Sequence, residues 1–236
     1  MYFALRAANR IENARLSDIN EELINAYSQI QKNVVPLIRT LSEHKKRHSK
    51  EYYYQIRGLN PDEMSSLERA ARMIYLNKTC FNGLYRVNKR GHFNVPIGSY
   101  KNPKIVDEER LRSASTLLKG TKIEVNDFGP IVDAAEPGDF IYFDPPYIPL
   151  STTSSFTSYT KSQFGEPEQR RLASSCEDLA NRGVNWLLSN SDTELTRSLW
   201  ASHNVETVRA TRAINSNASN RGQVTEVLVS PRKLVR

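Results

Sequence analysis

One stretch of sequence decides the predicted fold, and it reads Gly138-Asp139-Phe140-Ile141-Tyr142-Phe143-Asp144-Pro145-Pro146-Tyr147. The four apolar residues 140–143 predict a short strand that is buried on both faces of a sheet. Asp144 and the two prolines end this strand, because proline lacks the N–H donor that a strand ladder requires. In an open α/β sheet, ligands bind at the carboxyl ends of the strands, so we expect a functional site here.

The residues after this strand suit chemistry at an exocyclic amine, which is a poor nucleophile because the ring delocalises its lone pair. A carboxylate from Asp144 and a carbonyl from Pro145 or Pro146 would accept the two amine hydrogens and leave the lone pair free to attack. The Tyr147 ring would stack on a base rotated out of a duplex. The simpler alternative is that Asp144 caps a turn and the prolines only end the strand.

The composition is that of a globular protein with a polyanionic partner. The 236 residues are 39% hydrophobic and 25% charged, which predicts one domain with room for an inserted lobe. The formal charge of +7 favours a polyanionic partner. Cys80 and Cys176 lack paired spacing, so we expect buried thiols rather than a disulfide or a metal site. No apolar stretch reaches the roughly 18 residues that span a bilayer, and no signal peptide follows Met1, which predicts a cytoplasmic protein.

Alternating strand and helix patterns predict a largely parallel sheet. The expected elements are a helix over 2–9, strands over 14–18, 121–125, 140–143 and 185–188, a helix over 166–182, and a closing antiparallel pair at 205–210 and 224–229. Asp18 ends the first of these strands, and a helix follows from Ile19. An acid at that position commonly accepts hydrogen bonds from ribose hydroxyls, but it would equally serve as the N-cap of the helix.

The middle of the chain is predicted to be helical and to carry one hairpin. Ser65 and Glu68 form a capping box that begins a helix. Alternation on both sides of residues 88–91 predicts a β-hairpin with a basic tip. The residue types that read guanine and adenine edges in a major groove occur here as Arg86, Asn88, Arg90 and Asn94. An ordinary exposed hairpin is the alternative.

Motifs from three parts of the chain together resemble one known family. They are Phe81-Asn82-Gly83 with Arg86-Val87-Asn88 and Phe93-Asn94-Val95-Pro96, then Asp144-Pro145-Pro146-Tyr147, then Ser189-Asn190-Ser191-Asp192-Thr193. In this order, and from the first helix to the last strand, the chain resembles the Dam family, which are DNA adenine N6 methyltransferases of the alpha arrangement.

The resemblance implies a fold and an activity. The fold is α/β, with a Rossmann-like methyltransferase sheet formed by a catalytic domain of residues 1–34 and 117–236. A mainly helical target-recognition domain of residues 35–116, which carries the β-hairpin, is inserted in it. The implied activity moves a methyl group from S-adenosyl-L-methionine to a flipped adenine of double-stranded DNA, commonly in a short palindrome such as GATC. No metal is required, and we expect a monomer.

The resemblance also assigns roles to residues. The implied catalytic residues are Asp144, Pro145, Pro146 and Tyr147. The implied cofactor contacts are Asp18, Ile19, Asp127, Phe128 and Asp144. The implied DNA-reading residues are Arg86, Asn88, Lys89, Arg90, Asn94, Pro96, Tyr100 and Lys101.

The sequence departs from the family pattern at its N-terminal end. The family has a basic segment, a strand and a Phe-x-Gly-x-Gly loop before the first helix, whereas Met1-Tyr2-Phe3-Ala4-Leu5-Arg6 resembles the stretch after that loop. The missing strand would lie between those that end at Asp18 and Asp144. We therefore expect weak cofactor binding by this chain alone unless a second chain supplies the strand. The competing functions are a catalytically impaired DNA-binding remnant and transfer to RNA or to cytosine N4, because the same chemistry serves any exocyclic amine.

Overall fold

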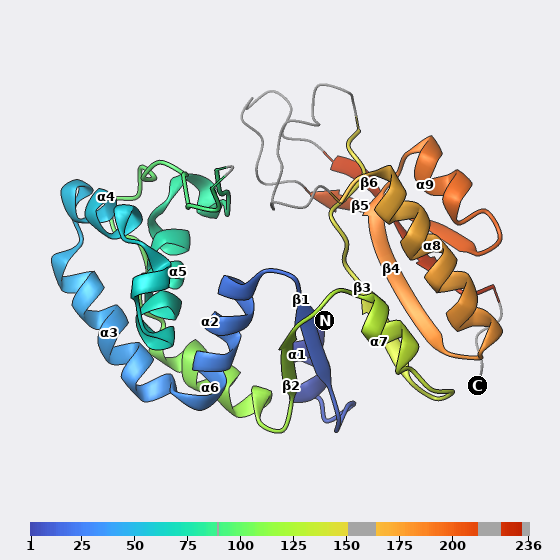
Figure 1. Ribbon diagram of the computed structural model, residues 1–236, viewed down its shortest axis with the longest axis horizontal. Coiled ribbons are helices and arrows are strands. Elements are labelled where there is room, and N and C mark those ends of the chain that lie inside the picture. Colours follow the sequence, from blue (N-terminus) through green and yellow to red (C-terminus); the bar gives the residue numbers. More distant parts are fainter. Residues whose placement is uncertain (89, 151–163, 212–222, 233–236) are drawn as a thin grey trace. The chain divides into compact units, whose positions relative to one another are not determined.

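The computed structural model describes residues 1–88, 90–150, 164–211 and 223–232 (Figure 1). The chain forms two compact units, Met1–Asp127 and Phe128–Arg236, and each has a hydrophobic core of its own. Among the described residues, no helix is both long and apolar enough to cross a membrane.

The first unit is mainly helical and contains one parallel pair of strands. Its helices are α1 (Tyr2–Ala7), α2 (Glu21–Lys32), α3 (Val34–Arg47), α4 (Lys50–Gly58), α5 (Ser66–Thr79) and α6 (Glu108–Leu118), with 3-10 turns η1 (Pro61–Glu63) and η2 (Phe81–Gly83). Its strands are β1 (Arg15–Asp18) and β2 (Lys122–Val125). The two strands pair in parallel, with Asp18 opposite Val125, so their carboxyl ends lie together.

Local sequence signals set where these helices begin. The side chain of Asn20 accepts hydrogen bonds from the backbone N–H groups of Glu22 and Leu23 and thereby caps α2. The carboxylate of Asp18 instead accepts the N–H of Asn20 at 2.7 Å. The interpretation of Asp18 as the N-cap is therefore wrong, because α2 begins at Glu21 and not at Ile19. The capping box predicted at the start of α5 is confirmed.

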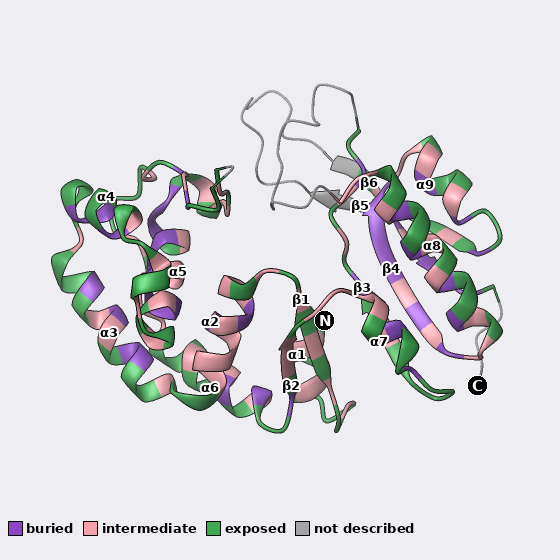
Figure 2. Ribbon diagram, viewed as in Figure 1, coloured by how far each residue is buried: buried purple, intermediate pink, exposed green. Residues whose placement is uncertain are grey.

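Aromatic and aliphatic side chains from α3, α4 and α5 form the core of the first unit, and buried positions recur along α3 and α5 (Figure 2). Arg72 is also buried there, with 4% of its surface exposed. Its guanidinium donates to the carbonyls of Ile56 at 3.0 Å and Arg57 at 2.9 Å, in the last turn of α4. A cation is favourable at that end of a helix, where carbonyl groups lack intrahelical partners.

His44 is a buried titratable group in this core. The ring is 8% exposed, its Nδ1 lies 2.7 Å from the Tyr52 hydroxyl, and it stacks on Tyr75 at a centroid distance of 4.9 Å. Burial lowers the pKa of His44 below its usual 6.5, and the charge of Arg47 lowers the pKa further. The unfolded chain therefore binds more protons than the folded chain as the pH falls. Stability is fully present above the unfolded pKa and is lost progressively below it.

We expect the melting temperature to fall as the pH is lowered from about 7 to about 5, and to fall less in His44→Gln. Thermal unfolding measured across this range checks the prediction. Burial also lowers the pKa values of His48 and His203, so the variant should keep part of the pH dependence. An acid sensitivity equal to that of the unsubstituted protein would show that His44 does not contribute.

The second unit contains a four-stranded sheet in the order β3-β4-β6-β5. Its elements are α7 (Gly129–Asp133), β3 (Phe140–Phe143), α8 (Glu166–Asn181), β4 (Asn185–Ser191), α9 (Glu194–Leu199), β5 (Asn204–Thr211) and β6 (Gln223–Ser230). Strands β3 and β4 are parallel, whereas β6 is antiparallel to both β4 and β5. Helix α8 packs along β4 (Figure 1). The predicted helix after residue 165 and the closing antiparallel pair are confirmed.

One prediction about the sheet is confirmed in part and another is wrong. As predicted, β1 pairs in parallel with β2 and β3 pairs in parallel with β4, but the described strands form a pair and a mixed sheet of four. The prediction that β3 is buried on both faces is wrong, since Phe143 is 7% exposed but Phe140 and Tyr142 are 54% and 40% exposed. Among the described residues β3 pairs with β4 alone, and its side chains alternate between the core and the opposite face. A short apolar run does not distinguish a strand in this position from a central one.

The core of the second unit lies between the sheet and the helices α8 and α9, and its largest fully buried side chains are Trp186, Trp200, Leu172, Leu179 and Leu188. Cys176 belongs to this core and Cys80 to that of the first unit, and both cysteines are fully buried and free, as predicted. Burial raises the thiol pKa of Cys80 to about 11 and that of Cys176 to about 12. Both thiols therefore stay protonated at neutral pH and are poor nucleophiles.

Candidate active site

Asp144 lies at the carboxyl end of β3, beside the end of β4. The register places Phe143 opposite Leu188, so Asp144 and Ser189 emerge at the same edge of the sheet. The Ser189 hydroxyl donates to Oδ1 of the exposed Asp144 carboxylate at 3.0 Å. The Tyr142 hydroxyl lies 3.0 Å from the Ser189 oxygen and completes a chain of three polar groups. Because Ser189 donates to the carboxylate, Tyr142 donates to Ser189.

The turn after Asp144 is held from beneath by polar side chains. The carbonyl of Pro146 accepts a hydrogen bond from Gln169 of α8 at 2.8 Å. The N–H of Ile148 donates to Oδ1 of Asn190 on β4 at 2.9 Å. Pro145 is half-buried, whereas Pro146 is exposed. The turn is therefore fixed at two backbone positions, one on each side of Tyr147.

Tyr147 is half-buried, and its hydroxyl donates to Oε2 of Glu226 on β6 at 3.4 Å. Burial raises the pKa of Tyr147, a hydrogen bond with Ser189 partly opposes this rise, and the carboxylates of Glu226 and Asp144 raise the pKa further. The phenol is therefore neutral at neutral pH. A neutral ring anchored by its hydroxyl provides a flat surface for stacking.

Removing the Ser189 hydroxyl tests whether the orientation of Asp144 matters. We expect Ser189→Ala to lower the turnover of the methyl transfer that the family resemblance implies by about tenfold, because a hydrogen bond to a charged group contributes about 1.5–3 kcal/mol. Turnover and the KM for cofactor, measured on purified protein, check this prediction. Ser189→Thr keeps the hydroxyl and should retain most of the turnover. An alanine variant with unchanged turnover would show that Asp144 is oriented without this hydrogen bond.

Three of the residues expected to contact the cofactor lie at the carboxyl ends of β1 and β2 in the first unit. The N–H of Asn126 donates to the carbonyl of Asp18 at 3.2 Å, which places Asp127 next to the end of β1. Asp18 and Asp127 are half-buried, and Ile19 is 43% exposed. Two acids and an exposed apolar side chain therefore lie together at this edge.

Phe128 is the first residue of the second unit. Its half-buried ring lies under the guanidinium of Arg171, 3.8 Å from the ring centroid, and the edge of Phe164 packs against it at 6.2 Å. Arg171 also pairs with Glu168 at 2.7 Å. The phenylalanine ring is therefore held by a cation and by a second ring.

The predicted hairpin is a tight turn with limited strand pairing. Val87 and Phe93 form an isolated antiparallel bridge, and Asn88 N–H donates to the carbonyl of His92 at 2.8 Å. The Asn88 side chain accepts from the N–H groups of Arg90 at 2.9 Å and His92 at 3.1 Å. The Asn88 side chain therefore stabilises the turn by accepting these two hydrogen bonds. The residue pattern did not predict this role.

The residues predicted to read DNA fall on this turn and on the segment that follows it. The exposed Arg86 donates through Nε to Oδ1 of the half-buried Asn94 at 2.7 Å. The other exposed members of the set are Asn88, Arg90, Pro96, Tyr100 and Lys101, whereas Lys89 lies outside the described residues. Tyr53 and Arg57 of α4 both donate to the carbonyl of Val95 and anchor the turn to the helical core.

Sequence reasoning missed Gln169 as a site residue, although a signal was present. Gln169 precedes Leu172, Cys176 and Leu179 at helical spacing, so it occupies the buried stripe of α8. A polar side chain on such a stripe requires a hydrogen-bond partner. That partner is the carbonyl of Pro146.

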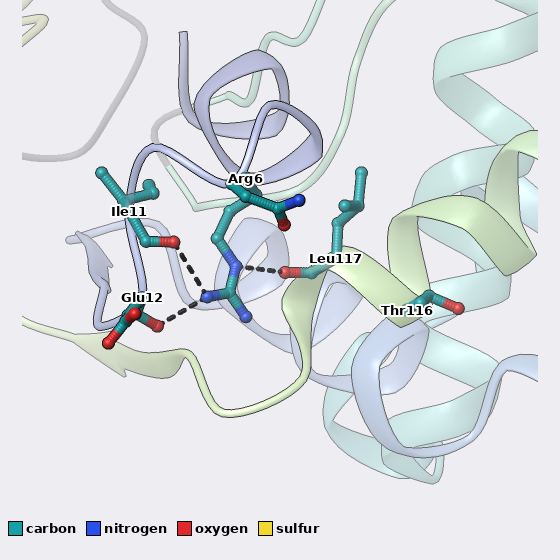
Figure 3. Close-up of a pocket in the computed structure, with 6 residues that line it drawn as sticks. Arg6, Ile11, Glu12, Thr116 and Leu117 are labelled. Atoms are coloured by element: carbon teal, nitrogen blue, oxygen red, sulfur yellow. Dashed lines mark hydrogen bonds between the residues drawn. The ribbon is translucent and has the colours of Figure 1, made fainter.

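A cavity of about 510 Å³ in the first unit does not coincide with any predicted site residue (Figure 3). It is lined by Arg6, Asn9, Ile11, Glu12, Thr116 and Leu117. The Arg6 guanidinium donates to four backbone carbonyls, including that of Leu117 at 3.1 Å, so its charge serves to join α1 to α6. Across the described ranges, no group of three or more His, Cys, Asp or Glu side chains is placed to hold a metal ion.

Comparison with known proteins identifies the family. Residues 2–214 match the model of the D12 class N6 adenine-specific DNA methyltransferase family. A type II methyltransferase of Lactococcus lactis subsp. cremoris is 45% identical over 225 residues, which are 93% of this chain and 79% of the relative. A type II methyltransferase of Methanocaldococcus jannaschii is 44% identical over 219 residues, covering 87% and 75%. A DNA adenine methylase of Vibrio cholerae is 37% identical over 216 residues, covering 90% and 78%. The chain therefore belongs to the D12 class of N6 adenine-specific DNA methyltransferases.

Proposed function

We propose that this chain methylates N6 of an adenine that is flipped out of double-stranded DNA, within a short palindrome such as GATC. The observation that carries the proposal is the Asp144 carboxylate, held by Ser189 at the edge of the sheet and followed by two prolines and Tyr147. A transferase that acts on a base within a duplex must first extrude it, and Tyr147 offers the ring on which it would stack.

The hydrogen bond between Ser189 and Asp144 determines which carboxylate oxygen is free to bind the adenine amine. Ser189 binds Oδ1 of Asp144, so Oδ2 is the oxygen that would accept one hydrogen of the adenine amine. A proline carbonyl would accept the other hydrogen. Two acceptors draw the amine toward a tetrahedral geometry and localise its lone pair, which raises its nucleophilicity. The nitrogen would gain the methyl group as the bond between that methyl group and the sulfur of the donor breaks. One amine proton would leave through the Asp144 carboxylate to solvent.

S-adenosyl-L-methionine fits the residue types predicted to hold it and, when bound, supplies an electrophilic methyl group. Asp18 presents a carboxylate suited to ribose hydroxyls, and the exposed side chain of Ile19 beside it suits the apolar surface of a nucleoside. Asp127 would accept from the adenine amine of the cofactor, and Phe128 would contact its ring. Asp18 and Asp127 are adjacent in the first unit.

The helical core and its basic turn are the proposed DNA-reading part, corresponding to the predicted recognition domain of residues 35–116. The charge of +7 supports a polyanionic partner. Arg86, oriented by Asn94, supplies a guanidinium suited to guanine. We propose that a monomer binds one duplex, which sedimentation of the complex tests.

Transfer of tritium-labelled methyl groups from the cofactor tests the proposal. We expect incorporation into a duplex with one GATC site and none into the same duplex methylated beforehand at both adenine N6 positions. Binding of the duplex without incorporation would support the non-catalytic DNA-binding alternative. Preferential labelling of RNA or of cytosine would overturn the assignment of adenine in DNA as the acceptor.

A further inference from the structure

Two buried amide side chains lie under the turn that carries the proposed catalytic residues. Gln169 is 2% exposed and Asn190 is fully buried. Asn190 Nδ2 donates to Gln169 Oε1 at 3.2 Å, and Gln169 Nε2 donates to the carbonyl of Pro146 at 2.8 Å. Oδ1 of Asn190 accepts the N–H groups of Ile148 at 2.9 Å and Ser191 at 2.8 Å.

The orientation of both amides follows from the backbone. Ile148 and Ser191 present N–H groups, which only donate, so Asn190 must turn its oxygen toward them. Its NH₂ group then faces Gln169, which must present its own oxygen in return. The NH₂ group of Gln169 is thereby aimed at the Pro146 carbonyl. Hydrogen bonds running from β4 through α8 to the turn thus leave each amide one orientation.

We propose that Gln169 and Asn190 form an amide clamp that positions the catalytic turn relative to the adenine amine. The clamp engages the carbonyl of Pro146 and the N–H of Ile148, on both sides of Tyr147. It therefore restrains the backbone on both sides of Tyr147. Gln169 is a positioning residue that acts through Pro146, and its role rests on the proposed function of the turn.

Stability alone does not require this arrangement. Buried amides lose their hydration and regain only part of it as hydrogen bonds, so an apolar side chain would serve a purely packing role on the stripe of α8. Catalysis requires more than packing, because the acceptor must lie within hydrogen-bond distance of the base. A misplacement of about 1 Å can lower the rate by about a hundredfold. The two roles predict different responses to substitution.

The experiment compares Gln169→Leu and Gln169→Glu with the unsubstituted protein and with a control variant, Gln31→Leu. Gln31 makes the same kind of contact, donating to the carbonyls of Leu118 at 2.7 Å and Thr121 at 2.8 Å, but it belongs to the first unit and, within the described residues, has no hydrogen bond to the turn. We expect Gln169→Leu to lower turnover by at least about tenfold with an unchanged KM for cofactor. The control should lose stability only.

The glutamate variant adds a pH signature. At high pH an ionised carboxylate would place an acceptor against the Pro146 carbonyl and repel it, whereas the protonated acid would donate as the amide does. Turnover of Gln169→Glu should therefore recover relative to the unsubstituted protein as the pH is lowered from about 8 to about 6. Gln169→Leu should show no recovery. Loss of turnover in both variants without this pH difference would assign Gln169 to packing and overturn the proposal.

Amide hydrogen exchange provides a readout that needs no activity. The Ile148 N–H should be protected in the unsubstituted protein and in the Gln31 control, and should exchange at least about tenfold faster in Gln169→Leu. If the unsubstituted protein transfers no methyl group, the proposed function fails, and this exchange still decides whether the clamp holds the turn. Unchanged protection of Ile148 in Gln169→Leu would overturn the clamp.

Discussion

Replacing Asp144 with alanine is expected to lower methyl transfer to adenine by about a thousandfold while leaving duplex binding within about twofold. The carboxylate is exposed at the end of β3 and is hydrogen-bonded through Oδ1 to Ser189, so its removal deletes an amine acceptor without opening the core. Single-turnover transfer and duplex binding, measured on the same preparation, check the prediction.

Two further variants test whether the loss of methyl transfer is due to the charge of Asp144. Asp144→Asn keeps the shape and the Ser189 contact but removes the charge, and we expect a loss nearly as large as that of alanine. Asp139→Asn is a matched control just before the same strand, where the carboxylate accepts the backbone N–H of Glu136 at 3.0 Å and does not approach Ser189. It should leave turnover unchanged. Normal turnover in Asp144→Ala would remove the proposed role of this acid.

The sequence predicted local elements well and their assembly less well. Capping at Ser65 and Glu68 and the helix after residue 165 depend on side chains close in sequence, and both are confirmed. The exposure of Phe140 and Tyr142 depends on what packs against that face of β3, which four apolar residues do not encode. The division into a strand pair and a mixed sheet likewise arises from long-range pairing.

The candidate site shows the same division. A carboxylate at the end of an apolar strand was predictable, because the residues that end the strand also carry the chemistry. The contact of Asp144 with Ser189 required the register of β3 against β4. The contact between Gln169 and Pro146 required the packing of α8 on the sheet. Asn88 was predicted to read bases, but its side-chain oxygen is used within the turn.

Replacing Arg86 with alanine is expected to reduce discrimination between GATC and a site with one altered base pair by about 1–3 kcal/mol, or roughly 5–150-fold. Its Nε–H is directed at Asn94 at 2.7 Å, so the guanidinium plane is oriented before DNA binds. A pre-oriented planar fork suits bidentate contact with guanine better than a flexible ammonium group. Compared with Arg86→Ala, the Arg86→Lys variant should therefore keep the positive charge but should not regain the discrimination between GATC and the altered site.

Competition binding with a panel of single-substituted duplexes, repeated at several salt concentrations, distinguishes base reading from phosphate contact. If Arg86 touches only phosphate, its loss would weaken binding to every duplex equally and reduce the salt dependence by about one unit of slope. Arg112 is the matched control, since it is exposed on α6 and pairs with Glu108 at 2.8 Å. Arg112→Ala should leave discrimination unchanged, which separates a local role of the turn from the general charge of the protein.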